Sequence, residues 1–513
     1  MLVAAGIFLS RIFGLVRNSV LAHYFGASAV ADAYTLALRI PNFLQNLLGE
    51  GALSASFIPV YAGLRARGEH EEAGRVAGAV LALLALVTAV LVLVGMLVTP
   101  QLVSVLAPGF VGEKRELTIR LVRILFPGIA LLVVSAWCLG ILNSHRRFLL
   151  SYAAPVAWNV AIIATLIWFG GRVGMVELAV AAAWASVAGA VLQVLVQLPT
   201  VLRLERGLRV GLRRTGAHVR TVVRNFGPTV LSRGVVQLSA WVDTIIASLL
   251  GNGAAAALGY AQQLTTLPVS LFGMSVSAAE LPAMSSATGT SEQIAAALRD
   301  RLDGGLRRVA YFVVPSAAAF IFLGDAIAGA ILQGGRFTAA DTRLVWAILA
   351  GSALGLLATT MGRLYSSAFY ALHDTHTPMR YAVVRIALTM VLGYLAAIHL
   401  PPRLGLAPQW GAALLTATAG VVGWLEFALL RRGVQRRVGH TGVPAGHVAR
   451  LWGAALAAAA VGIGVKLAPG MDGRAGALLA IGLFGLTYVG ATLALRVPEA
   501  DALVSAVRRR RRG

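Results

Sequence analysis

The stretch LSRIFGLVRNSVLAHYFGASAVADAYTLALRIPNFLQNLLGEGALSASFIPVY, residues 9–61, decides the fold class. It is long and apolar enough for two membrane crossings, because a helix needs about 20 apolar residues to span the hydrocarbon core. It also carries five charged side chains, those of Arg11, Arg17, Asp32, Arg39 and Glu50. Charges inside a membrane span are costly and usually mark a polar cavity or pathway. We therefore expect membrane helices that enclose a charged site.

The rest of the chain extends this pattern. Of its 513 residues 58% are hydrophobic and only 13% are charged, and apolar runs of span length recur throughout. The sequence predicts an all-α polytopic membrane protein with about fourteen transmembrane helices, among them spans at 76–106 and 309–332 and an eleventh span at 378–399. The second and eighth predicted spans, residues 29–62 and 254–286, are too long for one straight crossing. We expect bends at Pro41, around Gly49–Gly51 and near Pro268, since proline removes a helix hydrogen bond.

Charge sets the orientation and excludes several functions. The net charge is +23, carried by 42 arginines and only two lysines, Lys114 and Lys466. Loops after even-numbered spans, together with the C-terminal tail, hold about four times as many basic residues as the other loops, so we expect both termini in the cytoplasm. This distribution argues against nucleic-acid binding. The lone Cys138 excludes a disulfide within the chain.

Motifs for catalysis and for common cofactors are missing from the sequence. No phosphate-binding GxxxxGK[ST] loop occurs, which argues against an ATP-driven pump. No Ser/His/Asp set or carboxylate pair indicates an enzyme. His373 and His376 lie in a predicted polar turn, so we expect no metal site there, and no cofactor elsewhere. The sequence therefore favours a transporter.

Two short strings repeat at nearly one offset. Leu9-Ser10-Arg11 returns as Leu231-Ser232-Arg233, and SAxxIP at 54–59 returns as SAxxLP at 277–282. The offset equals six spans, so both copies keep one orientation, as in parallel transporter repeats. We expect two six-helix lobes in a parallel repeat, two further C-terminal helices and two basic cytoplasmic segments. The boundaries are 1–202 and 225–434 for the lobes, 203–224 for the linker, 448–497 for the added helices and 498–513 for the tail.

The chain resembles one transporter family over residues 1–440. The segments that carry the resemblance include SRIFGLVRNSVLAHYFG, ADAYTLALRIPN, GEGALSASFIPVY, LAPGF, ILNSHRRF, APVAWN, VDTIIASLL, YAQQL, GRFTAADT and YALHDTHTP. They resemble the MurJ (MviN) family of lipid II flippases in the MOP exporter superfamily. The resemblance implies a fourteen-span fold. It also implies movement of lipid II, the undecaprenyl-pyrophosphate-linked peptidoglycan precursor, between leaflets of the bacterial cytoplasmic membrane by alternating access.

The resemblance also implies site residues. Arg11, Arg17 and Asp32 match functional positions of the family, while Asn46 and Gln263 stand where the family usually has arginines. Guanidinium groups bind pyrophosphate through several charge-assisted hydrogen bonds. We expect the two matching arginines to bind the substrate, and our hypothesis is that Arg39 and Arg233 replace the two lost ones.

Coupling and partners are open at this stage. Asp243 matches a sodium-site aspartate of some members, and Thr389 is the one candidate partner in the eleventh span. Coupling to Na⁺, to H⁺ or to the membrane potential, or no coupling, is open. We expect a monomer that contacts membrane lipids and associates with the cell-wall synthesis machinery. Alternatives are an exporter of another polyprenyl-linked glycan or of a drug or cation, and a scaffold that transports nothing.

Overall fold

The described chain is almost entirely helical. The computed structural model describes residues 2–211, 216–286, 290–471, 473–503 and 505, without the side chains of 2–5, 7, 8, 50, 51, 228–240 and 291. Those residues contain helices and turns but no β-strand beyond an isolated Gly334–Phe337 bridge. They form two compact units, unit 1 (Met1–Ala256 with Gly334–Phe337) and unit 2 (Ala257–Gln333 with Thr338–Gly513).

Unit 1 contains nine complete helices among its described residues. They are α1 (Leu2–Phe25), α2 (Ala29–Leu48), α3 (Glu50–Ala66), α4 (His70–Leu97), α5 (Thr99–Leu106), α6 (Gly112–Ser144), α7 (Phe148–Phe169), α8 (Met175–Leu204) and α9 (Ala217–Ser248). The helix α10 (Ala254–Pro268) begins in unit 1 and continues into unit 2. In α6, 72% of the apolar 18-residue stretch that could cross the membrane is buried, whereas in α4 only 22% of that stretch is buried. Helix α6 therefore lies at the centre of the unit and α4 at its edge.

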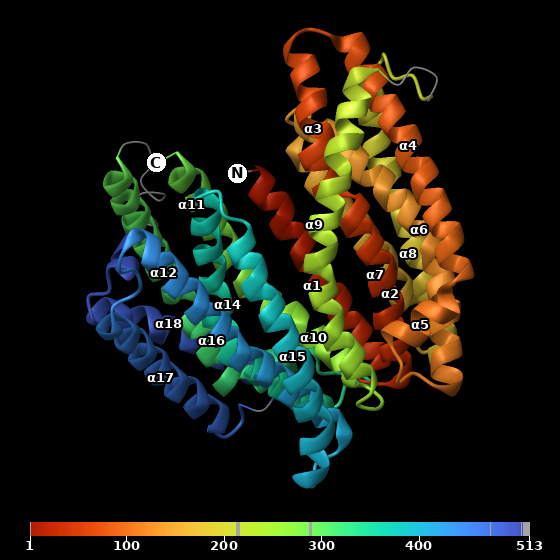
Figure 1. The fold of residues 1–513 in the computed structure, drawn as a ribbon. Coiled ribbons are helices and arrows are strands. Elements are labelled where there is room, and N and C mark those ends of the chain that lie inside the picture. Colours follow the sequence, from red (N-terminus) through yellow and green to blue (C-terminus); the bar gives the residue numbers. More distant parts are fainter. Residues whose placement is uncertain (1, 212–215, 287–289, 472, 504, 506–513) are drawn as a thin grey trace. The chain divides into compact units, whose positions relative to one another are not determined.

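Unit 2 contains the remaining helices. They are the π-helix η1 (Val269–Met274), α11 (Ser275–Ser285), α12 (Ser291–Phe322), α13 (Gly324–Leu332), α14 (Ala339–Ala371), α15 (His376–Arg403), the 3₁₀ turn η2 (Pro408–Trp410), α16 (Gly411–Val438), α17 (Ala445–Leu467) and α18 (Arg474–Ala494). The central helix is α14. A Cβ on Gly355 would lie 2.4 Å from the Cα of Gly420 in α16, so glycine permits this close helix crossing. The last two helices lie side by side (Figure 1).

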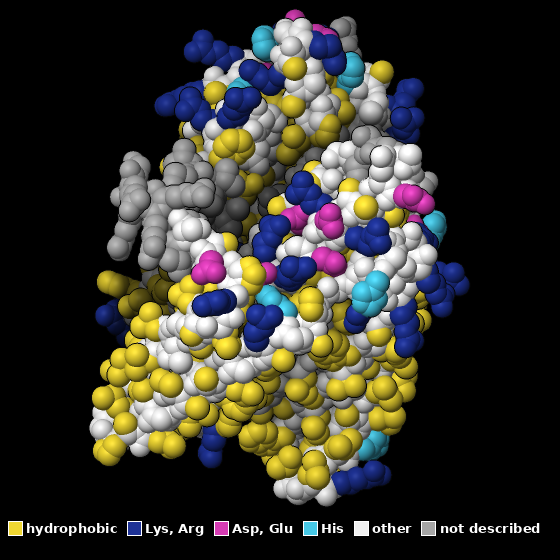
Figure 2. Space-filling view, turned by 90° about the vertical axis from the view of Figure 1, so that its left-hand side faces the viewer, with side chains coloured by type: hydrophobic (Ala, Val, Ile, Leu, Met, Phe, Trp, Pro, Cys, Tyr) yellow, Lys and Arg dark blue, Asp and Glu magenta, His cyan; other side chains and the backbone are white. Residues whose placement is uncertain are grey.

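The membrane assignment holds. Twelve helical segments among the described residues have the length and composition of a membrane span. The other two expected spans, α1 and α9, have 24 and 32 residues and are long enough to cross. Figure 2 shows broad areas of hydrophobic side chains on the face turned to the viewer, with most charged side chains grouped outside those areas. The predicted all-α polytopic fold is confirmed.

The predicted bends can be compared one by one. The second span breaks at Gly49, between α2 and α3, as expected, while α2 continues through Pro41 without interruption. In the eighth span α10 ends at Pro268, where the π-helix η1 begins, also as expected. A π-helical turn leaves the ordinary hydrogen-bond ladder, as the proline requires.

Two span predictions were wrong at their ends. The span predicted at 76–106 is divided at Val98, because Thr99-Pro100 begins the separate helix α5 with proline in its first turn. The span predicted at 309–332 begins instead at Ser291, where Thr290 and Gln293 form a capping box, and it ends at Phe322 before α13. The apolar pattern missed this start because the first turns of α12 are charged.

The segment between α8 and α9 packs against α4 at its start. Helix α8 continues to Leu204 and α9 already begins at Ala217, where residues 203–224 were expected to be linker. A Cβ on Gly78 would lie 2.2 Å from the carbonyl oxygen of Arg209, so α4 receives the linker backbone directly. By packing, α9 belongs to unit 1. The lobe boundaries follow the sequence repeat instead, and they stay a prediction.

A buried polar cluster fixes the start of that linker. Glu205 is 3% exposed and accepts hydrogen bonds from the Tyr61 hydroxyl and from Arg65 Nη1, the latter at 3.3 Å. His145 Nε2 lies 3.0 Å from the same hydroxyl. Because burial disfavours the imidazolium and Arg65 repels it, the pKa of His145 is lowered from its ordinary value. The cluster joins the ends of α3, α6 and α8.

Candidate functional site

Asp32 is the most completely bonded of the predicted site residues. It lies in the first turn of α2, is fully buried and accepts three hydrogen bonds. Lys114 Nζ donates to Oδ2 at 2.6 Å, the Gly253 N–H donates to Oδ2 at 2.8 Å, and the Ala256 N–H donates to Oδ1 at 2.7 Å. The carboxylate thus caps the start of α10 with its negative charge, where a helix presents unpaired N–H groups.

The backbone around Asp32 is shaped for this contact. Ser28 caps α2 by accepting a hydrogen bond from the Ala31 N–H at 3.2 Å. Gly253 has φ +85, and a Cβ there would lie 2.3 Å from the Ala27 carbonyl oxygen. Only glycine fits both requirements. We call the contact of Asp32 with Lys114, Gly253 and Ala256 the Asp32 junction.

Lys114 is held from several sides. Its ammonium lies 4.0 Å from the centre of the Phe110 ring and 3.3 Å from Asn252 Oδ1, in addition to its ion pair with Asp32. Its side chain is 10% exposed. Lys114 entered the sequence argument only as a loop charge. The sequence signal that could have singled out Lys114 is the scarcity of lysine in this chain. The second lysine, Lys466, also pairs with an aspartate, Asp325 of unit 2.

Arg17 on α1 is stacked on an aromatic ring. Its guanidinium carbon lies 4.8 Å from the centre of the Trp158 ring on α7, and the indole N–H of Trp158 donates to the Ser186 carbonyl oxygen at 2.9 Å. Asn18 Oδ1 accepts from Arg17 Nη2 at 3.0 Å and from Nε at 3.3 Å. The guanidinium thus lies over the ring and binds Asn18 through two of its nitrogens, and a guanidinium has five N–H donors in all.

Arg39 repeats this arrangement on α2. Its guanidinium carbon lies 5.8 Å from the centre of the Trp241 ring on α9, and Phe43 packs against that ring edge-on at 6.0 Å. Asp243, two residues after the tryptophan, interacts electrostatically with the guanidinium. Asp32, Arg39 and Asn46 are each seven residues apart, so α2 presents them on nearly one face.

The structure brings together only part of the predicted set. Arg17, Asp32, Arg39 and Asp243 belong to unit 1, whereas Gln263 and Thr389 belong to unit 2. The side chain of Arg233 lies outside the described residues, as does that of Glu50.

Three other predicted residues differ in their burial. Arg11 is half-buried and has no hydrogen-bond or ion-pair partner among the described side chains. Asn46 is exposed near the end of α2, and Thr389 is buried on α15. The two tryptophans under the arginines were not singled out from the sequence, although the APVAWN motif contains Trp158.

A second set of membrane charges, in unit 2, was not predicted as a site. Arg385 Nε on α15 lies 2.9 Å from Glu426 Oε2 on α16, and Arg363 on α14 interacts electrostatically with both. On α11 the buried Glu280 forms an ion pair with Arg308 of α12, with 2.9 Å between Oε1 and Nη2. The described part of the chain contains no cluster of three or more His, Cys, Asp or Glu side chains that could hold a metal ion.

Comparisons with known proteins agree on one family. The family model described as "Lipid II flippase MurJ" matches residues 21–469. The "Lipid II flippase MurJ" of Burkholderia cenocepacia is 32% identical over 437 residues, 84% of this chain and 82% of that one. The "Probable lipid II flippase MurJ" of Rhizobium tropici is 32% identical over 440 residues, 84% and 79% of the two chains.

Solved structures extend the likeness to the fold. A structure titled "Lipid II flippase MurJ, inward closed conformation" has a TM-score of 0.76 at 24% identity and covers 96% of this chain and 99% of its own. An inward-facing multidrug transporter of the MATE family, in the MOP superfamily, has a TM-score of 0.66 at 18% identity and covers 83% and 96%. At 24% and 18% identity, these two structures support the fold only.

Proposed function

The chain belongs to the MurJ family of lipid II flippases, and we propose that its stacked arginines Arg17 and Arg39 bind the pyrophosphate of lipid II while the lipid crosses the membrane. The protein is accordingly a transporter of the MOP superfamily and not an enzyme. Its cargo is the lipid-linked peptidoglycan precursor, and its cycle opens alternately to the two sides of the membrane. The observation that carries the proposal is the pair of membrane-embedded guanidinium groups, each fixed over a tryptophan.

The chemistry of the substrate explains this pairing. A pyrophosphate carries concentrated negative charge, which cannot enter hydrocarbon without compensating donors. Guanidinium offers five N–H donors in a planar fork, so it can bind phosphate oxygens in pairs. The cation–π contacts with Trp158 and Trp241 restrict each guanidinium before the substrate arrives, which reduces the entropy lost on binding.

The Asp32 junction supports a closed outer gate. From the loop charges we expect the starts of α2, α6 and α10 on the outer side of the membrane. The junction holds these three helix ends together through one ion pair and two backbone hydrogen bonds. We propose that the outer side opens when Asp32 leaves the first turn of α10, and that binding of the pyrophosphate and release of the junction alternate.

The ion that drives transport is part of the proposal, and the surroundings of Asp243 limit the choice. Asp243 interacts electrostatically with Arg39, so a sodium ion there would share the carboxylate with a guanidinium. This favours H⁺ or the membrane potential over Na⁺ as the driving force. Monomeric state, cytoplasmic termini and association with the cell-wall synthesis machinery are likewise part of the proposal.

A rescue experiment in a bacterium depleted of its own flippase tests the assignment. The wild-type chain restores growth, Arg17→Ala does not, and Arg17→Lys restores it only partly because lysine lacks the planar fork. The matched control is Arg403→Ala, an exposed arginine at the end of α15. If the wild-type chain reaches the membrane and fails to rescue, a different cargo, such as another polyprenyl-linked glycan or a drug, replaces lipid II in the proposal. If Arg17→Ala rescues fully, Arg17 does not bind the substrate.

A further inference from the structure

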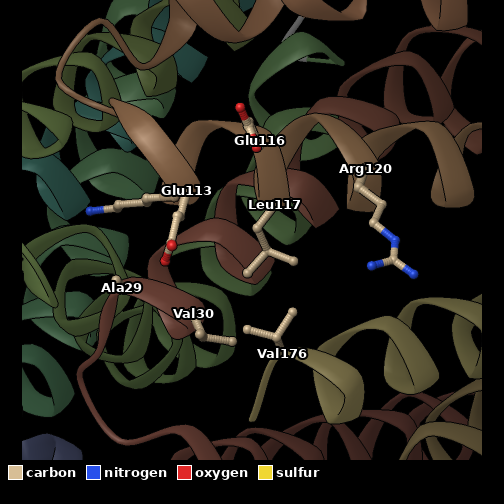
Figure 3. A pocket seen from close by; sticks show the side chains of 8 residues that line it. Ala29, Val30, Glu113, Glu116, Leu117, Arg120 and Val176 are labelled. Atoms are coloured by element: carbon tan, nitrogen blue, oxygen red, sulfur yellow. The ribbon is translucent and has the colours of Figure 1, made fainter. Parts of the chain in front are cut away.

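Two adjoining pockets lie along one face of α6 in unit 1. The first, of about 370 Å³, lies between the starts of α2, α6 and α8 (Figure 3). The second, of about 610 Å³, continues along α6 between the end of α4 and Trp184 of α8. Both are lined by Glu116 and Arg120, so together they form one groove, which we call the α6 groove.

The α6 groove carries charges of both signs that do not pair with each other. Glu113, Glu116 and Arg120 have no ion-pair or hydrogen-bond partner among the described side chains, and Arg123 bonds only to the Met96 carbonyl oxygen, at 3.3 Å. Glu116 and Arg120 stand one turn apart, a spacing that favours an ion pair on a helix. Their side chains nevertheless point in different directions (Figure 3). Each charge is therefore available to a ligand.

The groove changes from charged to apolar along its length. Its first part holds the two glutamates, and its far part is lined by Ile124, Pro127 and Trp184. A helix of 33 residues is about 50 Å long, so α6 extends about 10 Å beyond a 30 Å hydrocarbon core at each end. Arg120 and Arg123 lie about 12 and 16 Å from the start of the helix. They therefore lie close to the boundary between lipid headgroups and acyl chains.

Trp184 marks the same depth independently. It is the tenth residue of α8 and is 58% exposed. Exposed tryptophan is enriched where headgroups meet hydrocarbon, because its ring is apolar while its N–H is polar. The headgroup level inferred from the length of α6 and the position of this tryptophan on α8 thus agree.

We propose that the α6 groove binds a phospholipid of the phosphatidylethanolamine class from the leaflet that the loop charges identify as the outer one. Arg120 and Arg123, three residues apart on one helix face, bind the phosphate. Glu113 and Glu116 bind the primary ammonium, and an acyl chain lies along the apolar part beside Trp184. The headgroup thus meets charges complementary to both of its own. A lipid with phosphate alone leaves the two glutamates unpaired.

The bound lipid also contacts the Asp32 junction. The first pocket is lined by Lys114 and by Ala29 and Val30, the first residues of α2. A headgroup there packs against two of the three helix starts that the junction joins, those of α2 and α6. We therefore expect the lipid to stabilise the closed junction. This site is separate from the stacked arginines, so it stands whether or not Arg17 binds pyrophosphate.

The test uses the purified full chain in detergent. Phosphatidylethanolamine, phosphatidylcholine and phosphatidylglycerol with the same acyl chains are added, binding is counted by native mass spectrometry, and thermal unfolding is recorded. We expect phosphatidylethanolamine to bind best and to raise the melting temperature most. Arg120→Gln with Arg123→Gln lowers its apparent affinity about tenfold or more, because charge-assisted hydrogen bonds are lost. Arg403→Ala, the exposed-arginine control in unit 2, leaves it unchanged.

A second variant isolates the ammonium half of the site. Glu113→Gln with Glu116→Gln keeps the phosphate contacts, so we expect phosphatidylethanolamine to lose its advantage over phosphatidylcholine without losing binding. This variant carries the test if the double arginine variant does not fold. Equal binding of all three lipids, preference for phosphatidylglycerol, or displacement of the bound lipid by lipid II each overturns the proposal. So does an unchanged preference in both double variants.

Discussion

Replacing Asp32 by asparagine should open the outer gate. The substitution removes the negative charge from a fully buried position and leaves the 10% exposed Lys114 without its ion-pair partner. It also places an amide N–H where the Lys114 ammonium or the Gly253 and Ala256 N–H groups now donate. Removing one partner of a buried ion pair costs about 3–5 kcal/mol. At about 1.4 kcal/mol per power of ten, the ratio of open to closed gate rises by roughly two to three and a half powers of ten.

Cysteine labelling from outside the cell measures that ratio. Cys138 is the only cysteine and is buried, so Cys138→Ala provides a background without thiols. Asn46→Cys then places a thiol on the same face of α2 as Asp32, four turns further along. A membrane-impermeant maleimide reaches it only through an open outer gate. While the open fraction is small, the labelling rate is proportional to that fraction.

A double-mutant cycle identifies the cause. Lys114→Met also opens the gate, but less, because Asp32 keeps its two backbone N–H donors. In the combined Asp32→Asn, Lys114→Met variant no unpaired ammonium is buried, so the labelling rate should rise by much less than the product of the single effects. Unchanged labelling in Asp32→Asn would refute the gating role of the junction. Strict additivity would show that the ion pair contributes nothing to it.

Three further predictions concern single positions. Arg17→Lys should lower lipid II transport in proteoliposomes by about ten- to a hundredfold, because the charge stays but the paired donors are lost; unchanged transport contradicts the stacked-arginine site. Gly253→Ala should lower the melting temperature, since a Cβ there meets backbone 2.3 Å away at φ +85, whereas Gly464→Ala, in open space on α17, should not; equal shifts would contradict this. Burial lowers the pKa of His145, so the unfolded chain binds the proton more readily than the folded chain does. The stability contributed by neutral His145 should therefore be lost as the pH falls from about 6.5 through the lowered pKa. His145→Gln should flatten that part of the melting-temperature profile, and an unchanged profile would contradict it.

The fold could be predicted because the patterns that determine it are local in the sequence. Apolar runs of span length, Gly49 and Pro268 each act within a few residues, so the spans and two of the bends could be predicted. The exact helix ends could not, because the start of α12 depends on a capping box formed by Thr290 and Gln293 in a charged segment. Likewise the lobe boundary from the repeat cannot show that α9 packs with unit 1.

Only part of the candidate site could be predicted from the sequence, because several partners of its charged residues lie far away along the chain. A costly charge in an apolar span is visible in the sequence, so Arg17, Asp32 and Arg39 could be singled out. Their partners come from distant positions: Lys114 pairs with Asp32 across 82 residues, and Trp158 and Trp241 look like ordinary apolar residues until α7 and α9 are in place. The hypothesis that Arg233 restores a lost charge stays a prediction, since its side chain lies outside the described residues.

The two lysines of this arginine-rich chain have a practical consequence. Besides the N-terminus, Lys114 and Lys466 are the only amines in the molecule, and each is held by an aspartate. Amine acylation requires that the reagent reach the nitrogen, and the Lys114 side chain is only 10% exposed in its ion pair. Lys114 should therefore react only when the Asp32 junction is released, while Lys466, whose side chain is 29% exposed, serves as an internal reference. The unmodified protein thus carries its own footprinting probe of the gate, readable by mass spectrometry in cells without an introduced label.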